Sequence, residues 1–340
     1  MSTHLESAAA PAASAVADLT YRDAICAALE DEMAADPGVL LMGEDVGEAG
    51  GVFKTSVGLF ERFGAERVRD TPICENGFVG VALGLSVTGF RPVVEIMFSD
   101  FLPTAGDAIV NELPKFRFMS GGQCSVPVTV RSVGGSSGRF GTQHSATGES
   151  WYMALPGLKV VTAGTPDSAY SLLRAAIRCD DPVLFFEHRG LYGRKGPVER
   201  GDANVAAEGK AHIARAGDDV TIVATLLMLD RALQAAERLA AEGISAEVVD
   251  LRWLRPFDQG TVERSVARTG ALVIVEEQLH DAGWGASLVS RMALGGSLPA
   301  QRTRVLSLAD HLLIPYTPRL EDEVIPSVDA VVEAARAAVG

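Results

Sequence analysis

Short apolar runs alternate with amphipathic segments along the chain, a pattern typical of α/β proteins. In the first half, apolar runs predict buried strands at 39–42, 91–98, 126–132, 158–163 and 182–188. The segments between them have helical spacing, and the expected helices are 21–35, 75–88, 104–118 and 166–178. Because these strands are apolar on both faces, we predict a parallel sheet with helices on each side.

The alternation is interrupted at 189–210, where glycine, proline and mixed charges indicate a connection between domains, with the linker at 196–210. Beyond it, the expected strands are 220–224, 246–251, 271–277 and 304–308. The expected helices lie near 230–242, 258–269, 285–294 and 328–339. We therefore predict an α/β fold of two domains, each a mostly parallel sheet covered by helices. The expected parts are a disordered tail at 1–18, a first domain at 19–195, and a second domain at 211–340.

Composition narrows the class of protein. The 340 residues are enough for two domains, and 47% apolar residues are enough for two cores. No apolar run approaches the roughly 20 residues of a membrane span. The opening "MSTHLESAAAPAASAVADLT" lacks a basic stretch followed by an apolar core, so we do not expect a secretory signal. A formal net charge of −14 disfavours nucleic acid as a partner.

The four cysteines are scattered through the sequence, at Cys26, Cys74, Cys124 and Cys179. They show no CxxC spacing, which argues against a zinc site and against a disulfide framework. This usage suits a reducing compartment. We therefore expect a soluble cytoplasmic protein without a membrane partner.

One carboxylate stands out in the stretch "TPICENGFVG". Glu75 begins an expected helix that is otherwise apolar or small, with Gly77, Gly80 and Gly84 three and four residues apart. Each glycine costs a helix about 1 kcal/mol, so this spacing indicates a demand for close approach by a ring or another helix. A simpler interpretation is that Glu75 caps the helix, where a negative charge is favourable.

Other candidate residues lie in loops after strands. His144 is in the long glycine-rich loop "VGGSSGRFGTQHSATGES", and such loops inside compact domains are usually functional. Glu44 and Asp45 follow an expected strand, where the site of an α/β protein usually opens. A packed or surface histidine and simple loop capping are the alternatives. His188 and His280 are interpreted as structural.

The sequence resembles a known family in several long stretches that occur in order: "GEDVGEAGGVFKTSVGLFERFG", "RVRDTPICENGFVGVALGLSVTGFRPVVEIMFSDF", "AIVNELPKFRFMSGG", "TQHSATGESWYMALPGLKVV" and "GWGASLVSR". They are similar to the beta subunit of thiamine-diphosphate-dependent 2-oxoacid dehydrogenases, the pyruvate, branched-chain and acetoin enzymes. The likeness runs from about residue 19 to residue 340. It implies a pyrimidine-binding first domain and a transketolase-type C-terminal domain.

The resemblance implies a role for each candidate. Glu75 would face the N1′ nitrogen of the thiamine aminopyrimidine and favour its 4′-imino form, which requires a buried carboxyl group. His144 would lie near the reacting carbon and assist acyl transfer to a lipoyl group. Phe101 and Glu44 would line the pyrimidine pocket, with Asp45 nearby.

A missing motif bears on the partners. In this family, Gly-Asp-Gly followed about thirty residues later by Asn marks the chain that holds the diphosphate and its magnesium, and this sequence has no Gly-Asp-Gly. It also lacks a Walker loop and a GxGxxG after a strand. The resemblance thus implies an alpha subunit carrying that motif, in a heterotetramer of two alpha and two beta chains, and a lipoyl-bearing acyltransferase as the acyl acceptor.

The substrate and the acceptor stay open. The main hypothesis is oxidative decarboxylation of pyruvate or a branched-chain 2-oxo acid, with a slight lean to the branched-chain relatives. The alternatives are an acetoin dehydrogenase and a transketolase-like subunit that passes a glycolyl or acyl unit to a carrier protein. A non-catalytic assembly subunit is a further alternative, against which the presence of Glu75 and His144 argues.

The resemblance also implies a potassium ion held mainly by backbone carbonyls of Val128, Ala176, Ile177, Cys179 and Asp181. Relatives usually have Asp at the position of Cys179. A hard cation prefers oxygen ligands, so the thiol of Cys179 is a poor replacement for that carboxylate. We therefore expect such an ion to be held by backbone oxygens.

Overall fold

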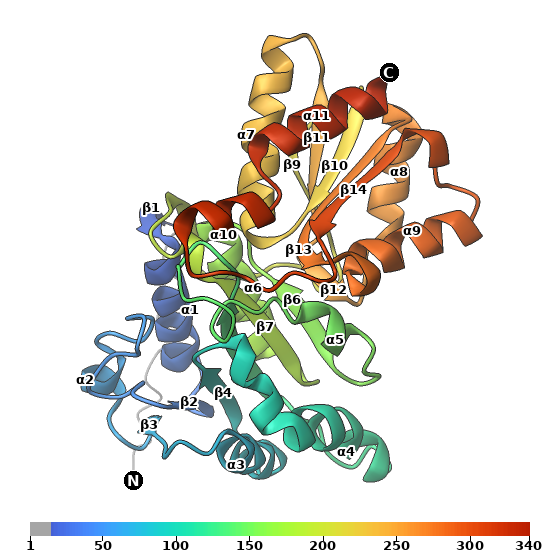
Figure 1. The fold of residues 1–340 in the computed structure, drawn as a ribbon. Coiled ribbons are helices and arrows are strands. Elements are labelled where there is room, and N and C mark those ends of the chain that lie inside the picture. Colours follow the sequence, from blue (N-terminus) through green and yellow to red (C-terminus); the bar gives the residue numbers. More distant parts are fainter. Residues whose placement is uncertain (1–14) are drawn as a thin grey trace, which may run out of the picture.

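The sheet of the first domain has the strand order β12-β6-β7-β5-β4-β2-β3 in the computed structural model, which describes residues 15–340 (Figure 1). Its strands are β2 (Val39–Gly43), β3 (Val68–Asp70), β4 (Arg91–Ile96), β5 (Thr129–Gly134), β6 (Lys159–Thr162), β7 (Val183–His188) and β12 (Trp253–Arg255). All run parallel except β12, which comes from the second half of the chain and pairs antiparallel with β6. The predicted parallel sheet is confirmed.

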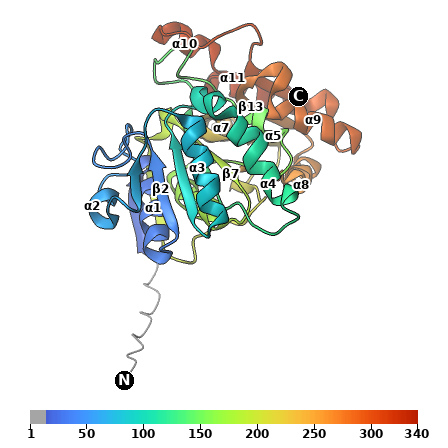
Figure 2. The ribbon, with the colours of Figure 1, turned by 90° about the horizontal axis from the view of Figure 1, so that it is seen from below.

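Helices cover both faces of this sheet because successive strand residues point to opposite sides. Leu41 packs with α1 (Tyr21–Ala35) and α6 (Pro166–Arg178), whereas Met42 packs on the face covered by α3 (Glu75–Val87). Figure 2 shows α3 and α4 on this second face. The remaining helical segments of the domain are α2 (Leu59–Phe63), η1 (Ser99–Ala105), η2 (Ala108–Glu112), α4 (Leu113–Met119), α5 (Glu149–Met153) and η3 (Arg189–Leu191).

The single helix expected at 104–118 is wrong in detail. The chain there forms three short segments, η1, η2 and α4, of which η2 is a π-helix. Pro103 lies inside η1, and Pro114 lies in the first turn of α4. Only Pro114 lies inside the expected span. Because a proline has no N–H to donate and crowds the preceding turn, a regular α-helix cannot continue through it.

The second domain has a five-stranded sheet in the order β14-β13-β10-β11-β9. The strands are β9 (His212–Arg215), β10 (Val220–Ala224), β11 (Ala246–Asp250), β13 (Leu272–Leu279) and β14 (Thr303–Leu308), and only β9 is antiparallel. Its helical segments are α7 (Leu226–Ala241), α8 (Gln259–Thr269), η4 (His280–Ala282), α9 (Trp284–Leu294), η5 (Ala300–Arg302), α10 (Pro318–Val324) and α11 (Val328–Val339). Helices α7 and α11 pack on one face of the sheet, and α8 and α9 pack on the other. In residues 15–340, every helix is too short or too polar to cross a membrane.

The chain ends of the first domain differ from the expectation. Residues 15–18 were expected in a disordered tail, but they belong to β1 (Ala15–Thr20). This strand pairs antiparallel with β8 (Lys195–Arg200), which lies largely within the predicted linker. Both corrections have one cause, because each strand supplies the hydrogen-bond partners of the other. The rest of the expected tail, 1–14, lies outside the described residues.

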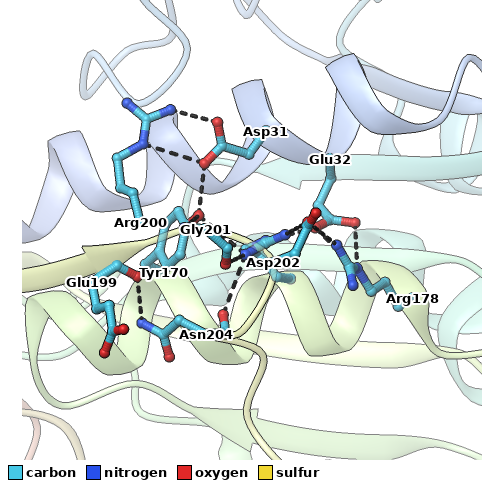
Figure 3. Close-up of polar contacts among 10 residues, drawn as sticks. Asp31, Glu32, Tyr170, Arg178, Glu199, Arg200, Gly201, Asp202 and Asn204 are labelled. Atoms are coloured by element: carbon cyan, nitrogen blue, oxygen red, sulfur yellow. Dashed lines mark hydrogen bonds and ion pairs between the residues drawn. The ribbon is translucent and has the colours of Figure 1, made fainter. Parts of the chain in front are cut away.

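Buried charges fix the chain as it leaves the first domain. Arg174 on α6 is buried and donates to Glu32 Oε1 on α1 at 2.6 Å and to Asp202 Oδ1 at 3.1 Å. Figure 3 shows the neighbouring contact, in which Arg200 and the Tyr170 hydroxyl donate to Asp31. The start of the connection is thus clamped against α1 and α6.

Candidate active site at the carboxyl edge of the first sheet

The sequence-predicted residues lie where the parallel strands of the first sheet end. Glu44 directly follows β2, Glu75 is the first residue of α3 after β3, and Phe101 lies in η1 after β4. His144 lies in the loop after β5. Parallel strands bring their carboxyl ends to the same edge, which is where α/β proteins bind ligands.

Glu75 has a free carboxyl group. It is partly buried, and it makes no hydrogen bond or ion pair within residues 15–340. The N-cap position belongs to Cys74, whose side chain makes no capping bond. The structure therefore shows no capping hydrogen bond that would account for a carboxyl group at this position. This chain alone also leaves the Glu75 carboxyl group less buried than the tautomerisation role requires.

Glu44 lies beside Glu75 and also lacks a partner. Its Oε1 is buried without a hydrogen bond, as is Oγ1 of Thr71, whose N–H donates to Gly43 O at 2.9 Å. Burial, and then the negative charges of Glu75 and Asp45, raise the pKa of Glu44. Buried polar atoms without partners are rare in folded proteins, so these two oxygens indicate a ligand site.

Asp45 follows in a left-handed conformation, with φ of 56°, and is exposed. Residues other than glycine seldom adopt this conformation unless the surroundings hold them there. Glu44 and Asp45 thus form a turn directly after β2.

His144 and Phe101 are brought together by aromatic packing. The imidazole stands edge-on to Phe98, with ring centroids 4.7 Å apart, and edge-on to Phe101 at 5.4 Å. Such perpendicular contacts restrict the orientation of a ring. His144 and Phe101 are partly exposed, whereas Phe98 is buried, so the imidazole has a fixed base and an open side.

The loop that carries His144 is tied to η1 at one residue. Ser99 Oγ donates to Ala146 O at 2.6 Å, and Ala146 N donates to Asp100 Oδ2 at 3.1 Å. Burial raises the pKa of Asp100, and the Ala146 N–H and His144 oppose that rise. Both backbone polar groups of Ala146, two residues after His144, are thus hydrogen-bonded to the segment that carries Phe101.

Sequence reasoning missed the residues of the second domain that reach this loop. Glu277, near the end of β13, accepts a hydrogen bond from Ser136 N, and Glu321 on α10 accepts one from Ser137 N. Glu321 is fully buried and Glu277 nearly so. The available signal was the pair Glu276-Glu277 at the end of an apolar run, because carboxylates are seldom buried without a specific partner.

A neutral carboxylic acid joins the two domains. Glu149, the first residue of α5, is buried and accepts a hydrogen bond from Gln278 Nε2 on β13. Burial raises the pKa of Glu149 to about 8, and the nearby Glu277 carboxylate adds to the effect. At neutral pH Glu149 therefore holds its proton.

Glu149 makes the stability of the fold decrease as pH rises. The unfolded side chain loses its proton near pH 4.3, whereas the folded one keeps it to about pH 8. The contribution of Glu149 to the free energy of unfolding is fully present below the pKa of the unfolded chain and is lost as pH rises through the pKa of the folded protein. Between the two pKa values the free energy of unfolding falls by up to about 1.4 kcal/mol per pH unit. Glu149→Gln should remove that slope between pH 5 and 8 in denaturant unfolding. Glu247→Gln, a buried control on β11, should keep the wild-type slope, and an unchanged slope in Glu149→Gln would rule out this role.

Two of the three glycines of α3 have no packing partner in the described part of the chain, whereas a Cβ on Gly77 would lie 2.8 Å from Cys74 Sγ. Gly80 and Gly84 have no atom within 4 Å of the position where a Cβ would lie. On the same exposed helix, the side chain of Val81 is 54% exposed, and Ile73, just before the helix, is 84% exposed. If these glycines serve close approach, the approaching group comes from outside residues 15–340.

The expected potassium site is not supported. Its expected members are Val128, Ala176, Ile177, Cys179 and Asp181. Arg91 Nη1 donates to the carbonyl oxygens of Ile177 at 3.2 Å and of Cys179 at 3.1 Å. The carbonyl of Val128 accepts from Val183 N at 2.9 Å. Two of the expected ligand oxygens therefore already accept hydrogen bonds from the positively charged guanidinium of Arg91.

The side chains near this position are also engaged. Lys159 Nζ lies 3.0 Å from Cys179 Sγ and 3.1 Å from Asp181 Oδ2. The carbonyl of Ala176 accepts from Cys179 N at 3.2 Å. In residues 15–340 no group of three or more His, Cys, Asp or Glu side chains has the arrangement of a metal site.

Comparisons with known proteins identify both domains. The family model "Transketolase, pyrimidine binding domain" matches residues 17–195, and "Transketolase, C-terminal domain" matches 209–331. The first of these implies dependence on thiamine diphosphate. Among solved structures, a split-gene transketolase described as an inactive beta4 tetramer has a TM-score of 0.76 and 24% identity, over 95% of this chain and 99% of that one. This likeness supports the fold.

Relatives resemble the chain over nearly its full length. "Pyruvate dehydrogenase E1 component subunit beta-2, mitochondrial" of Oryza sativa is 45% identical over 97% of this chain and 89% of the relative. "Acetoin:2,6-dichlorophenolindophenol oxidoreductase subunit beta" of Cupriavidus necator is 42% identical over 94% and 96%. "2-Oxoisovalerate dehydrogenase subunit beta" of Bacillus subtilis is 40% identical over 94% and 98%. The chain therefore belongs to the family of E1 beta subunits of the 2-oxoacid dehydrogenases, as its sequence motifs predicted.

Proposed function

We propose that this chain is the beta subunit of a thiamine-diphosphate-dependent enzyme that oxidatively decarboxylates a 2-oxo acid and passes the acyl group to a lipoyl group of a partner acyltransferase. One observation carries the proposal: two carboxyl groups without hydrogen-bond partners, Glu75 and Glu44 Oε1, lie together at the carboxyl edge of a pyrimidine-binding domain.

These residues fit the pyrimidine end of the cofactor. An aminopyrimidine offers a ring nitrogen and an amino group, which need a carboxyl group and a hydrogen-bond acceptor. Glu75 would hold and exchange a proton with the ring nitrogen, and Glu44 Oε1 and Thr71 Oγ1 are the unsatisfied oxygens available to an amino group. When bound, thiamine diphosphate supplies the carbon nucleophile. This chain supplies the proton exchange and the position.

A second chain is needed to exclude water from the site around Glu75. Glu75 is only partly buried here, and proton exchange with a ring nitrogen is favoured when water is excluded. The exposed Gly80, Val81 and Gly84 continue along α3 from Glu75. We propose that an alpha subunit covers this face of α3, holds the diphosphate and magnesium through a Gly-Asp-Gly motif, and forms an assembly of two alpha and two beta chains.

His144 is proposed to act on the acyl group. Its ring is oriented by Phe98 and Phe101 and has an open side, so a proton can be given to or taken from an intermediate at that side. Phe101 is proposed to border the pyrimidine pocket as well. The expected cytoplasmic location stays a prediction, because several relatives carry names that place them in mitochondria.

Substrate and acceptor can be determined in one reconstitution. The chain, mixed with an alpha partner, magnesium and thiamine diphosphate, should oxidise pyruvate or a branched-chain 2-oxo acid faster than acetoin when an artificial dye accepts the electrons. It should also acylate a lipoyl domain. Faster oxidation of acetoin would favour the acetoin enzyme. Acylation of a carrier protein instead of the lipoyl domain would favour the biosynthetic alternative, and no turnover with any donor would favour an assembly role.

A further inference from the structure

We propose that Glu277, on the second domain, positions His144 by holding both ends of the loop that carries it. The loop spans 135–148, between β5 and α5. The inference rests on the proposed role of His144 in acyl transfer, and it gives the second domain a part in the reaction.

Glu277 holds the start of the loop through its carboxylate. Oε1 accepts from Ser136 N at 2.6 Å, and Oε2 lies 2.9 Å from His188 Nε2. Because His188 Nδ1 accepts from Gly190 N at 3.0 Å, the ring proton is on Nε2 and is donated to Glu277. Both oxygens are thus used by groups of the first domain.

Glu277 holds the end of the loop through its backbone. Its carbonyl oxygen accepts a hydrogen bond from Thr147 Oγ1. His144 lies between Ser136 and Thr147, three residues before the second contact. One residue of β13 therefore fixes both flanks of the segment that carries the imidazole, and a shift of this strand would move both.

The loop is built to lie against this pair. Gly135 has φ of +84°, and a Cβ there would lie 2.0 Å from His188 Nε2, so only glycine fits. Farther along, Glu321 Oε1 accepts from Ser137 N at 2.8 Å, and Ile314 O accepts from Thr142 Oγ1 at 3.3 Å. Figure 1 shows α10, which carries Glu321, beside this loop.

The charge of Glu277 strengthens the clamp. Burial opposes ionisation, but the imidazole of His188 and the N–H of Ser136 outweigh it and lower the pKa of Glu277. A carboxylate accepts both donors, whereas an amide of the same shape accepts only one and turns an N–H toward the other. Leaving a buried donor unsatisfied is costly, so the amide should displace the loop while keeping the shape of the site.

The first test is Glu277→Gln in the complex with the alpha partner. Acyl transfer to a lipoyl domain should fall about 10- to 100-fold, because a displacement of about 1 Å can cost that much in rate. Decarboxylation with a dye acceptor should stay near wild type. Glu247→Gln is the matched control, a buried carboxylate that pairs with Arg268 and lies on β11, which β10 separates from β13. It should leave both rates unchanged.

A double mutant separates positioning from loosening of the fold. If Glu277 acts through His144, Glu277→Gln should cause no further loss of transfer in a His144→Ala background. His144→Ala alone should slow transfer more than dye-coupled decarboxylation. Should Glu277→Gln fail to fold, Thr147→Val removes the other contact and should slow the same transfer step.

The outcomes are distinguishable from failure of the proposed function. A wild-type complex that never acylates the lipoyl domain refutes that function. An active wild type with a fully active Glu277→Gln overturns the positioning role, as do equal losses in both assays or losses that add to those of His144→Ala. A His144→Ala variant with normal transfer overturns the role of the histidine and the positioning inference together.

Discussion

Glu75→Gln is expected to slow exchange of the thiazolium proton by about 100- to 10,000-fold, while thiamine diphosphate still binds in the presence of the alpha partner. Glutamine keeps the size of the side chain and can form a hydrogen bond to the pyrimidine, but it cannot exchange a proton with N1′. Binding should persist, because most of the anchoring is expected on the diphosphate. Deuterium incorporation into the bound cofactor, stopped by acid and followed by NMR, measures this rate.

A helix-capping role predicts a different result for the same variant. Losing a cap lowers stability by roughly 1 kcal/mol and leaves exchange near normal. The control is Glu61→Gln, because Glu61 lies in the first turn of α2 and is exposed. Exchange and melting are measured on both variants. Normal exchange in Glu75→Gln would refute the assignment of Glu75.

The fold could be predicted where strands are long and apolar on both faces. Runs such as 39–42 and 182–188 became β2 and β7, because buried parallel strands show themselves in local sequence. The pairing of β1 with β8 and the addition of β12 to the first sheet could not be predicted. Those strands are short or weakly apolar, and their partners lie far away in the sequence.

Part of the candidate site could be predicted because the buried parallel strands that carry it are visible in the local sequence. Glu44, Phe101 and His144 follow expected strands, and a parallel sheet brings such strand ends to one edge. Glu75 follows β3, which was not expected, and the family resemblance supplied its role and that of Phe101. Glu277 was not predictable, because its contact with Ser136 spans 141 residues and depends on how the domains pack.

The potassium expectation lacks support for a related reason. Arg91 is separated from Ile177 by 86 residues and from Cys179 by 88. A pattern of carbonyl positions in one segment cannot reveal that a distant guanidinium meets them. Charged groups brought in from far along the chain are what local motifs leave out.

The chain alone is expected to bind thiamine diphosphate weakly. The sequence has no Gly-Asp-Gly, and its formal net charge of −14 repels a diphosphate. Glu44 and Glu75 add two carboxyl groups at the pyrimidine end. An alpha partner that brings magnesium and the Gly-Asp-Gly residues should tighten binding by at least about 100-fold, which corresponds to about 2.8 kcal/mol.

Calorimetric titration of thiamine diphosphate in magnesium tests this division of the site most directly. The isolated chain should show weak binding, and the chain with its alpha partner should show binding at least about 100-fold tighter. The partner should improve binding of thiamine without the diphosphate much less, and a partner with Gly-Ala-Gly in place of Gly-Asp-Gly should lose the gain. Equally tight binding of thiamine diphosphate by the isolated, homogeneous chain would contradict a cofactor site shared between two subunits.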